Sequence, residues 1–234
     1  MSDPRVAVVT AAGRGIGAAC ARELAERGYR VVLMSRSDDA AALAKELDGV
    51  GLAGSVTEPD DLHRLVALAL DTHGRVDAVV NNTGAAPKGP LLDIPDDDWH
   101  AGLDLLLLNV ARMARLVTPV MTKQGGGAMV NISTLGAEEP DDRFPVSSTL
   151  RAALSAYAKL YADRYATAGI RMNNILPGFV DSYDVDEETR LEIPMQRTGT
   201  VAELAKTVAF LLSDDAGFIT GQNIRVDGGL ARSL

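Results

Sequence analysis

Short apolar runs alternate along this chain with longer segments whose apolar residues recur at helical spacing. The short runs are typical of strands buried on both faces, and we predict strands at 5–10, 30–35, 50–54, 76–81, 127–133, 170–176 and 222–226. The helical spacing predicts helices at 15–27, 38–48, 58–72, 96–123, 147–168 and 200–213. Thr57 with Asp60 resembles a capping box, and Thr200 with Glu203 matches one. Strict alternation of strand and helix predicts a doubly wound parallel sheet with helices on both faces.

No linker, low-complexity tract or tandem repeat interrupts this pattern, so we predict a single domain over residues 1–234. In such sheets ligands bind beyond the carboxyl ends of the strands, beside the first strand. The turns that follow residues 10, 35, 81, 133 and 176 are therefore expected to carry the chemistry.

A glycine-rich turn joins the first strand to the first helix. Gly13, Gly15 and Gly17 allow the backbone to turn tightly and a ligand to approach closely. The helix that starts near Ile16 directs unpaired N–H groups and the positive end of its dipole at the turn. A tight structural turn is the alternative interpretation, but the flanking strand and helix favour a Rossmann-like, dinucleotide-binding fold.

The end of the second strand bears on which dinucleotide binds. A carboxylate at this position would bond the ribose 2′-hydroxyl, yet the strand ends in Ser35 and Arg36, and the first acid is Asp38. Arg36, with Arg14 from the glycine turn, can pair with a 2′-phosphate. Two solvated surface arginines are the alternative, but their position favours NADP(H) over NAD(H).

The amino-acid composition excludes several classes of binding partner for this protein. The net charge is −9 and no long basic block occurs, so nucleic acid and anionic membranes are not expected partners. Apolar runs are short and the N-terminus lacks a signal-sequence pattern, so we expect no membrane segment. Cys20 is the single cysteine, which fits a reducing cytoplasm.

The motifs together resemble the short-chain dehydrogenase/reductases, in particular their 3-oxoacyl-acyl-carrier-protein reductase-like members. The resemblance runs from about residue 5 to 229 and rests on the segments 10–17 (TAAGRGIG), 81–84 (NNTG), 130–134 (VNIST), 173–178 (NNILPG) and 219–229 (ITGQNIRVDGG). It implies a nicotinamide-dependent carbonyl or alcohol oxidoreductase, usually a tetramer, with a catalytic Asn–Ser–Tyr–Lys set. Ala11, Thr83 and Ser55 depart from the family pattern.

The resemblance also extends the set of expected cofactor contacts. Asn81 and Gly84 resemble adenosine contacts, and Pro177 with Gly178 resembles the turn at the nicotinamide end. The full predicted set is Thr10, Gly13, Arg14, Gly15, Ile16, Gly17, Ser35, Arg36, Ser55, Val56, Asn81, Gly84, Arg151, Pro177, Gly178 and Val180.

The catalytic set of the family is replaced. Counted back from Pro177-Gly178, the family tyrosine falls on Ser147, the lysine on Arg151 and the serine on Thr134. With Trp99 and Pro119 held in register, the family asparagine falls on Leu106. Ser147 is a far weaker acid than tyrosine, whereas Arg151 keeps the positive charge and Thr134 keeps a hydroxyl. We predict Thr134, Ser147 and Arg151 as the catalytic residues.

Other polar residues are weaker candidates for the missing functions. Asn109 lies one helical turn beyond Leu106 and is a weaker candidate for the asparagine role. Asp181, Tyr183 and Asp184 lie in a segment that resembles the family's substrate loop, and we favour a mobile acidic lid over a relocated acid. Tyr157 and Tyr161 are interpreted as packing residues.

Three hypotheses follow. The first is a cytoplasmic NADP(H)-dependent oxidoreductase that acts on a small carbonyl or alcohol through the substituted groups. The second is a catalytically inactive dinucleotide-binding sensor or partner subunit, and the third is a non-redox enzyme on the same fold. The resemblance implies a homo-oligomer, a tetramer or a dimer, through the helices 96–123 and 147–168.

Overall fold

A single parallel sheet of seven strands forms the centre of the molecule, in the order β3-β2-β1-β4-β5-β6-β7. The structure is a computed structural model that describes residues 3–182 and 184–233. The strands are β1 (Val6–Val9), β2 (Arg30–Ser35), β3 (Val50–Ala53), β4 (Ala78–Asn81), β5 (Gly127–Ile132), β6 (Ile170–Pro177) and β7 (Asn223–Val226). The predicted doubly wound sheet is confirmed, with strand ends within one to two residues of most predicted limits.

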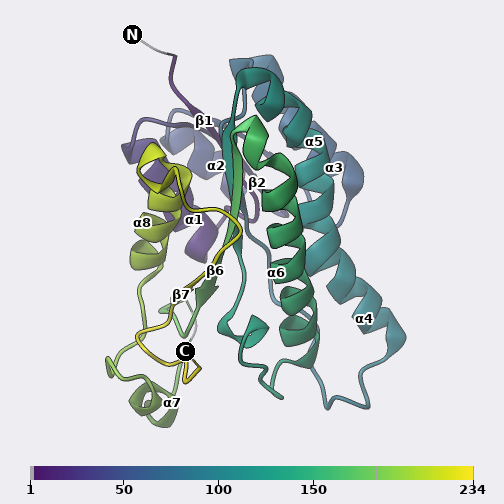
Figure 1. The fold of residues 1–234 in the computed structure, drawn as a ribbon, viewed down its shortest axis with the longest axis vertical. Helices are drawn as coiled ribbons and strands as arrows, with labels where there is room; N and C mark the ends of the chain where they lie inside the picture. The colour runs from purple at the N-terminus through teal and green to yellow at the C-terminus, as the bar shows by residue number, and fades with distance from the viewer. Residues whose placement is uncertain (1–2, 183, 234) are drawn as a thin grey trace.

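Helices cover both faces of the sheet (Figure 1). The longer helices are α1 (Gly15–Glu26), α2 (Asp39–Glu46), α3 (Pro59–His73), α4 (Asp96–Leu103), α5 (Asn109–Gln124), α6 (Pro145–Tyr165) and α8 (Val201–Leu212). Helices α1, α2 and α8 enclose one core and α3, α5 and α6 enclose the other. Successive strand residues point to opposite faces, so Val8 and Val9 of β1 enter different cores.

The two predicted capping boxes have different outcomes. The Thr200 side chain accepts a hydrogen bond from the Glu203 N–H, and the Glu203 carboxylate accepts one from the Thr200 N–H, so this box is confirmed. The box at Thr57 is wrong, because α3 begins at Pro59 and the Thr57 hydroxyl bonds the Ser55 hydroxyl at 2.8 Å. Proline supplies a preformed first helical residue that needs no N–H partner.

The predicted helix 96–123 is a continuous helix with a π-helical segment, Asp104–Leu108, between α4 and α5. The Asn109 N–H bonds the Asp104 carbonyl five residues back, and the Asn109 side-chain amide donates to the Leu105 carbonyl. The side chain thus bonds a carbonyl that the wider turn leaves without its usual partner.

Two further helices differ from prediction. Helix α6 begins at Pro145, two residues before the predicted limit, and a short 3-10 turn, Ala166–Ala168, follows its end at Tyr165. The short helix α7 (Glu187–Glu192) was not predicted, and the Asp186 side chain caps it by accepting from the Thr189 backbone.

By length and composition, one helix among the described residues could cross a membrane, Asp96–Gln124, with a mean hydropathy of 1.3. In the structure Val110, Met113 and Val117 of this helix lie in the core that α3 and α6 share. Packing in this core accounts for the apolar residues on the buried face of the helix.

Candidate active site

Several of the predicted site residues lie at the carboxyl edge of the sheet. Thr10, Ser35 and Asn81 stand at the carboxyl ends of β1, β2 and β4, and these strands are adjacent and parallel. Ser133 and Pro177 stand at the ends of β5 and β6 on the same edge. Parallel pairing brings these five positions, distant in sequence, to one edge of the sheet.

The glycine turn is tightly packed and leads into a helix start that has no side-chain cap. A Cβ on Gly17 would lie 2.3 Å from the Ala11 carbonyl oxygen, and Gly15 has a φ of +56° that favours glycine. Arg14 is the N-cap of α1 and makes no side-chain cap, so the first N–H groups of the helix have no side-chain partner there. An N-terminus of this kind binds anions.

Strand β4 holds the glycine turn in place. The Thr10 hydroxyl donates to the Asn82 carbonyl at 2.7 Å and accepts from the Asn82 N–H at 3.0 Å. The Asn82 side chain donates to the Ala11 carbonyl at 3.2 Å. Asn82 is absent from the predicted site, although two consecutive asparagines at a strand end are a recognisable signal.

Ser35 and Ser55 of the predicted adenosine side are engaged with neighbouring residues. The Ser35 hydroxyl donates to the Ser37 carbonyl at 2.8 Å and accepts from the Ala40 N–H at 3.1 Å, so it fixes the turn into α2. The Ser55 hydroxyl bonds Thr57 at 2.8 Å.

The remaining residues of the predicted adenosine side differ in exposure. Arg14, Arg36 and Gly84 are exposed, while Val56 is buried. In the described part of the chain neither arginine takes part in an ion pair or side-chain hydrogen bond. Both guanidinium groups are therefore available to an anion.

Thr134, Ser147 and Arg151 lie around the junction of β5 and α6. Arg151 is 8% exposed, and its Nη1 donates to the carbonyl of Ile132, the last residue of β5. Thr134 begins the 3-10 turn Leu135–Ala137, on which the first turns of α6 pack. Ser147 is half-buried in the first turn of α6, one turn before Arg151.

Two hydroxyl groups near this edge are buried without a partner among the described residues: Thr83 Oγ1 after β4 and Ser133 Oγ after β5. Buried polar atoms are normally bonded, so a bound polar ligand is one way to satisfy them. Together with the uncapped start of α1, they fit a dinucleotide laid along the edge.

Leu106, at the family asparagine position, is 1% exposed and occupies the π-helical segment. The Asn109 amide nitrogen is bonded to Leu105, and its Oδ1 is buried without a partner among the described residues. Asn109 thus bonds its own helix through one hydrogen of its side-chain amide.

The segment after β6 is anchored to the fold. A Cβ on Gly178 would lie 2.9 Å from Asp227 Cα, so the close approach requires glycine. Val180 is 4% exposed and bridges to Gly199. The Asp181 side chain accepts a hydrogen bond from the N–H of Val201, the first residue of α8, at 2.9 Å. Asp184 is exposed, and Tyr183 lies outside the described residues.

The tyrosines of α6 pack as predicted. The Tyr161 ring lies 6.4 Å from that of Tyr157 and 4.6 Å from that of Tyr165, and its hydroxyl bonds Thr118 at 2.5 Å. Burial raises the pKa of Tyr161 to about 12 and also raises the pKa of Tyr157. Neither phenol is adapted to release a proton near neutral pH.

Comparison with known proteins identifies the family. Residues 10–231 match a family described as enoyl-(acyl carrier protein) reductase. The chain is 34% identical to dehydrogenase/reductase SDR family member 4 of Oryctolagus cuniculus (98% of this chain, 95% of the relative). It is 33% identical to a 3-oxoacyl-[acyl-carrier-protein] reductase of Synechocystis sp. (97% and 96%).

Solved structures give the same result. YwfH, an NADPH-dependent reductase involved in bacilysin biosynthesis, superposes with a TM-score of 0.95 at 26% identity (99% of this chain, 100% of that one). L-Sorbose reductase from Gluconobacter frateurii, complexed with NADPH and L-sorbose, gives 0.89 at 26% identity (99% and 98%). The chain therefore belongs to the short-chain dehydrogenase/reductase family of oxidoreductases.

Proposed function

We propose that this protein is an NADP(H)-dependent oxidoreductase that reduces a small carbonyl compound or oxidises the corresponding alcohol. The observation that carries the proposal is the uncapped N-terminus of α1 behind a tightly packed glycine turn, at the edge where Thr134 and Arg151 also lie. The NADPH named for the two structural neighbours supports the choice of cofactor.

In the reductive direction, NADPH held at this edge would supply a hydride for the carbonyl carbon. The Thr134 hydroxyl donates a hydrogen bond to the substrate oxygen, and the Arg151 guanidinium stabilises the negative charge that develops there. The Ser147 hydroxyl passes a proton to this oxygen. Ser147 is half-buried, so solvent can return the proton and leave the hydroxyl unchanged after turnover.

Deuterium transfer tests this proposal directly. With NADPH deuterated at C4 of the nicotinamide, one stereochemical form is expected to transfer deuterium, as deuteride, to the carbinol carbon of the product, and the other is expected to transfer hydrogen. Mass spectrometry of products from a panel of ketones and 3-oxoacyl thioesters measures the transfer.

The other two hypotheses predict different results in the same assay. Tight NADPH binding without oxidation on any substrate would favour the sensor or partner subunit. Product formed without consumption of cofactor would favour a non-redox enzyme.

The proposed preference for NADP(H) rests on Arg14 and Arg36. Replacing Arg36 with alanine is expected to weaken NADPH binding by about 10- to 100-fold, because a charge-assisted bond to phosphate is lost, and to leave NADH binding nearly unchanged. Fluorescence titration with both cofactors measures this. Arg22→Ala is a matched control, since Arg22 is an exposed arginine paired with Glu46 on α2. Equal losses for NADPH and NADH would contradict the preference.

We also propose a cytoplasmic homo-oligomer, a tetramer or a dimer, with no nucleic-acid or membrane partner. The net charge of −9 supports the absence of nucleic acid. The outer surface shared by α5 and α6 supports self-association, because Tyr157, Tyr161 and Pro119 line a hollow there and Leu160 is 70% exposed.

A further inference from the structure

Four asparagines stand side by side at the carboxyl edge of the sheet. Asn81 of β4 is in register with Asn131 of β5, Asn131 with Asn174 of β6, and Asn174 with Asn223 of β7. Residues in register on parallel strands project from the same face, one strand spacing apart. This places one amide on each of four adjacent strands, a set that we call the asparagine ladder.

All amides of the ladder point the same way. Asn81 Nδ2 donates to Asn131 Oδ1, Asn131 Nδ2 to Asn174 Oδ1, and Asn174 Nδ2 to Asn223 Oδ1, each at 2.8 Å. Asn131 is fully buried and Asn174 is 1% exposed. Turning one amide alone would set two donors or two acceptors against each other in a dry environment. The ladder can therefore reverse its direction only as a unit.

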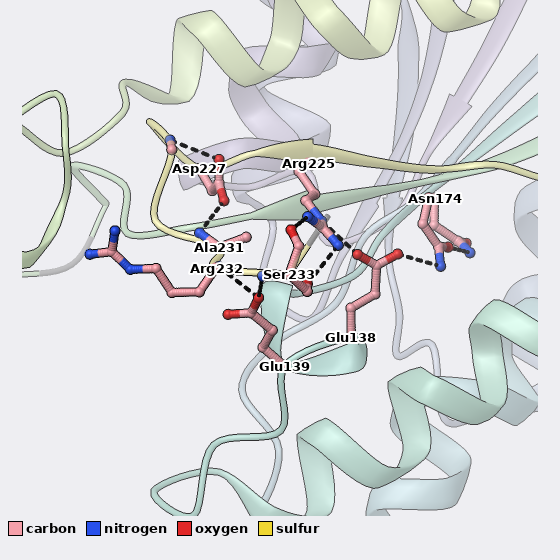
Figure 2. Close-up of polar contacts among 10 residues, drawn as sticks. Glu138, Glu139, Asn174, Arg225, Asp227, Ala231, Arg232 and Ser233 are labelled. Carbon is pink, nitrogen blue, oxygen red and sulfur yellow. Dashed lines mark hydrogen bonds and ion pairs between the residues drawn. The ribbon is translucent and has the colours of Figure 1, made fainter.

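Glu138 terminates the ladder and is an acceptor alone. Asn223 Nδ2 donates to Glu138 Oε1 at 3.1 Å, and Arg225 Nε donates to Glu138 Oε2 at 2.6 Å. Arg225 is in turn bonded to the Ser233 carbonyl at 2.6 Å and to its hydroxyl at 2.9 Å. Figure 2 shows Glu138 between Arg225 on one side and the amide groups beside Asn174 on the other.

With a carboxylate at this end, the hydrogen bonds of the ladder can run in only one direction. Because Glu138 has no proton to donate, Asn223 must present its NH₂ group to it and its oxygen to Asn174. The same requirement passes along the strands to Asn81, whose NH₂ faces β5. Its oxygen then lies on the opposite side of the amide, toward β1 and the glycine turn, and no described residue donates to it.

We propose that Glu138 is a positioning residue that sets the direction of the asparagine ladder, so that Asn81 presents an oxygen acceptor to the dinucleotide. The inference rests on the proposed function for the identity of the ligand. Glu138 itself acts three strands away from Asn81, through the hydrogen-bonded amides.

The substitution Glu138→Gln tests what sets the direction of the asparagine ladder, because it removes the charge and keeps the size of the side chain. Arg225, as a cation, is the strongest donor near the new glutamine and takes its oxygen. The glutamine NH₂ then faces Asn223, which has to accept, and the whole ladder reverses. Neutron diffraction from cofactor-free crystals is expected to show deuterium on the β1 side of the Asn81 amide in this variant and on the β5 side in the wild type. NADPH is expected to bind about tenfold more weakly, because an acceptor has become a donor.

A second substitution is designed to restore the direction. In Glu138→Gln/Asn223→Asp, the new aspartate accepts from both the glutamine and Asn174, so Asn81 should return to its original orientation and NADPH affinity should recover. Glu139→Gln is the matched control, because Glu139 accepts from the Arg232 and Ser233 N–H groups and lies outside the ladder. It is expected to leave NADPH affinity within about twofold of the wild type.

The outcomes separate the inference from the proposed function. An unreversed Asn81 amide in Glu138→Gln overturns the inference whether or not NADPH binds. A reversed amide with unchanged NADPH affinity also overturns it. Absence of NADPH binding by the wild type would refute the proposed cofactor, and with it the role of Asn81 toward that ligand.

Discussion

Replacing Gly17 with alanine is expected to weaken NADPH binding on the order of 100-fold and to lower the free energy of unfolding by about 1 to 3 kcal/mol. The added Cβ would lie 2.3 Å from the Ala11 carbonyl oxygen and 2.8 Å from Asn82 Nδ2. These two groups are hydrogen-bonded to each other at 3.2 Å. The methyl group would therefore push apart the contact that holds the glycine turn against β4 and would displace the N–H groups of α1.

Gly199→Ala is the matched control for this substitution. A Cβ at Gly199 would meet its nearest neighbour, Val180, at 3.6 Å, which is an ordinary contact. The control is expected to change the unfolding free energy by less than about 1 kcal/mol and to retain NADPH binding. Urea denaturation and fluorescence titration measure both variants. A Gly17→Ala protein that binds NADPH like the wild type would show that the turn is structural only.

The fold was accessible from the sequence because its signals are local. The apolar runs of the strands need no partner to be recognised as buried. The Thr200–Glu203 capping box forms within one helical turn, and the structure contains it. Register between strands then follows from parallel pairing, which brought Thr10, Ser35 and Asn81 to one edge as expected.

The features that were missed depend on contacts between distant segments. The Thr57 hydroxyl prefers Ser55 to the helix start, which the local pattern of the capping box does not reveal. The asparagine ladder and its end at Glu138 join residues up to 85 positions apart in sequence. The local signal for the ladder is an asparagine near the end of several successive strands. These asparagines can be recognised as one hydrogen-bonded row only once the register between the strands is known.

Two neighbouring serines at the start of α6 differ in their contacts. The Ser147 side chain is half-buried and makes no hydrogen bond with any residue that the structure describes. Ser148 is 4% exposed, and its hydroxyl accepts from the Asp141 N–H at 3.2 Å. The two hydroxyl groups therefore have different roles in the same turn of α6: Ser148 fixes the preceding loop, and Ser147 is available to a substrate.

Ser147→Ala is accordingly expected to lower kcat by about 10²- to 10⁴-fold, the usual loss for a positioned proton donor. NADPH affinity and thermal stability should stay close to those of the wild type, because the substitution removes no hydrogen bond to any described residue. Ser148→Ala should show the reverse pattern, with an unfolding free energy about 1 kcal/mol lower and kcat within a few-fold. Steady-state kinetics on the substrate found by deuterium transfer, together with thermal unfolding, separates the two. Equal kcat for Ser147→Ala and the wild type would move the proton donor away from α6, and would leave Thr134 and Arg151 to stabilise charge only.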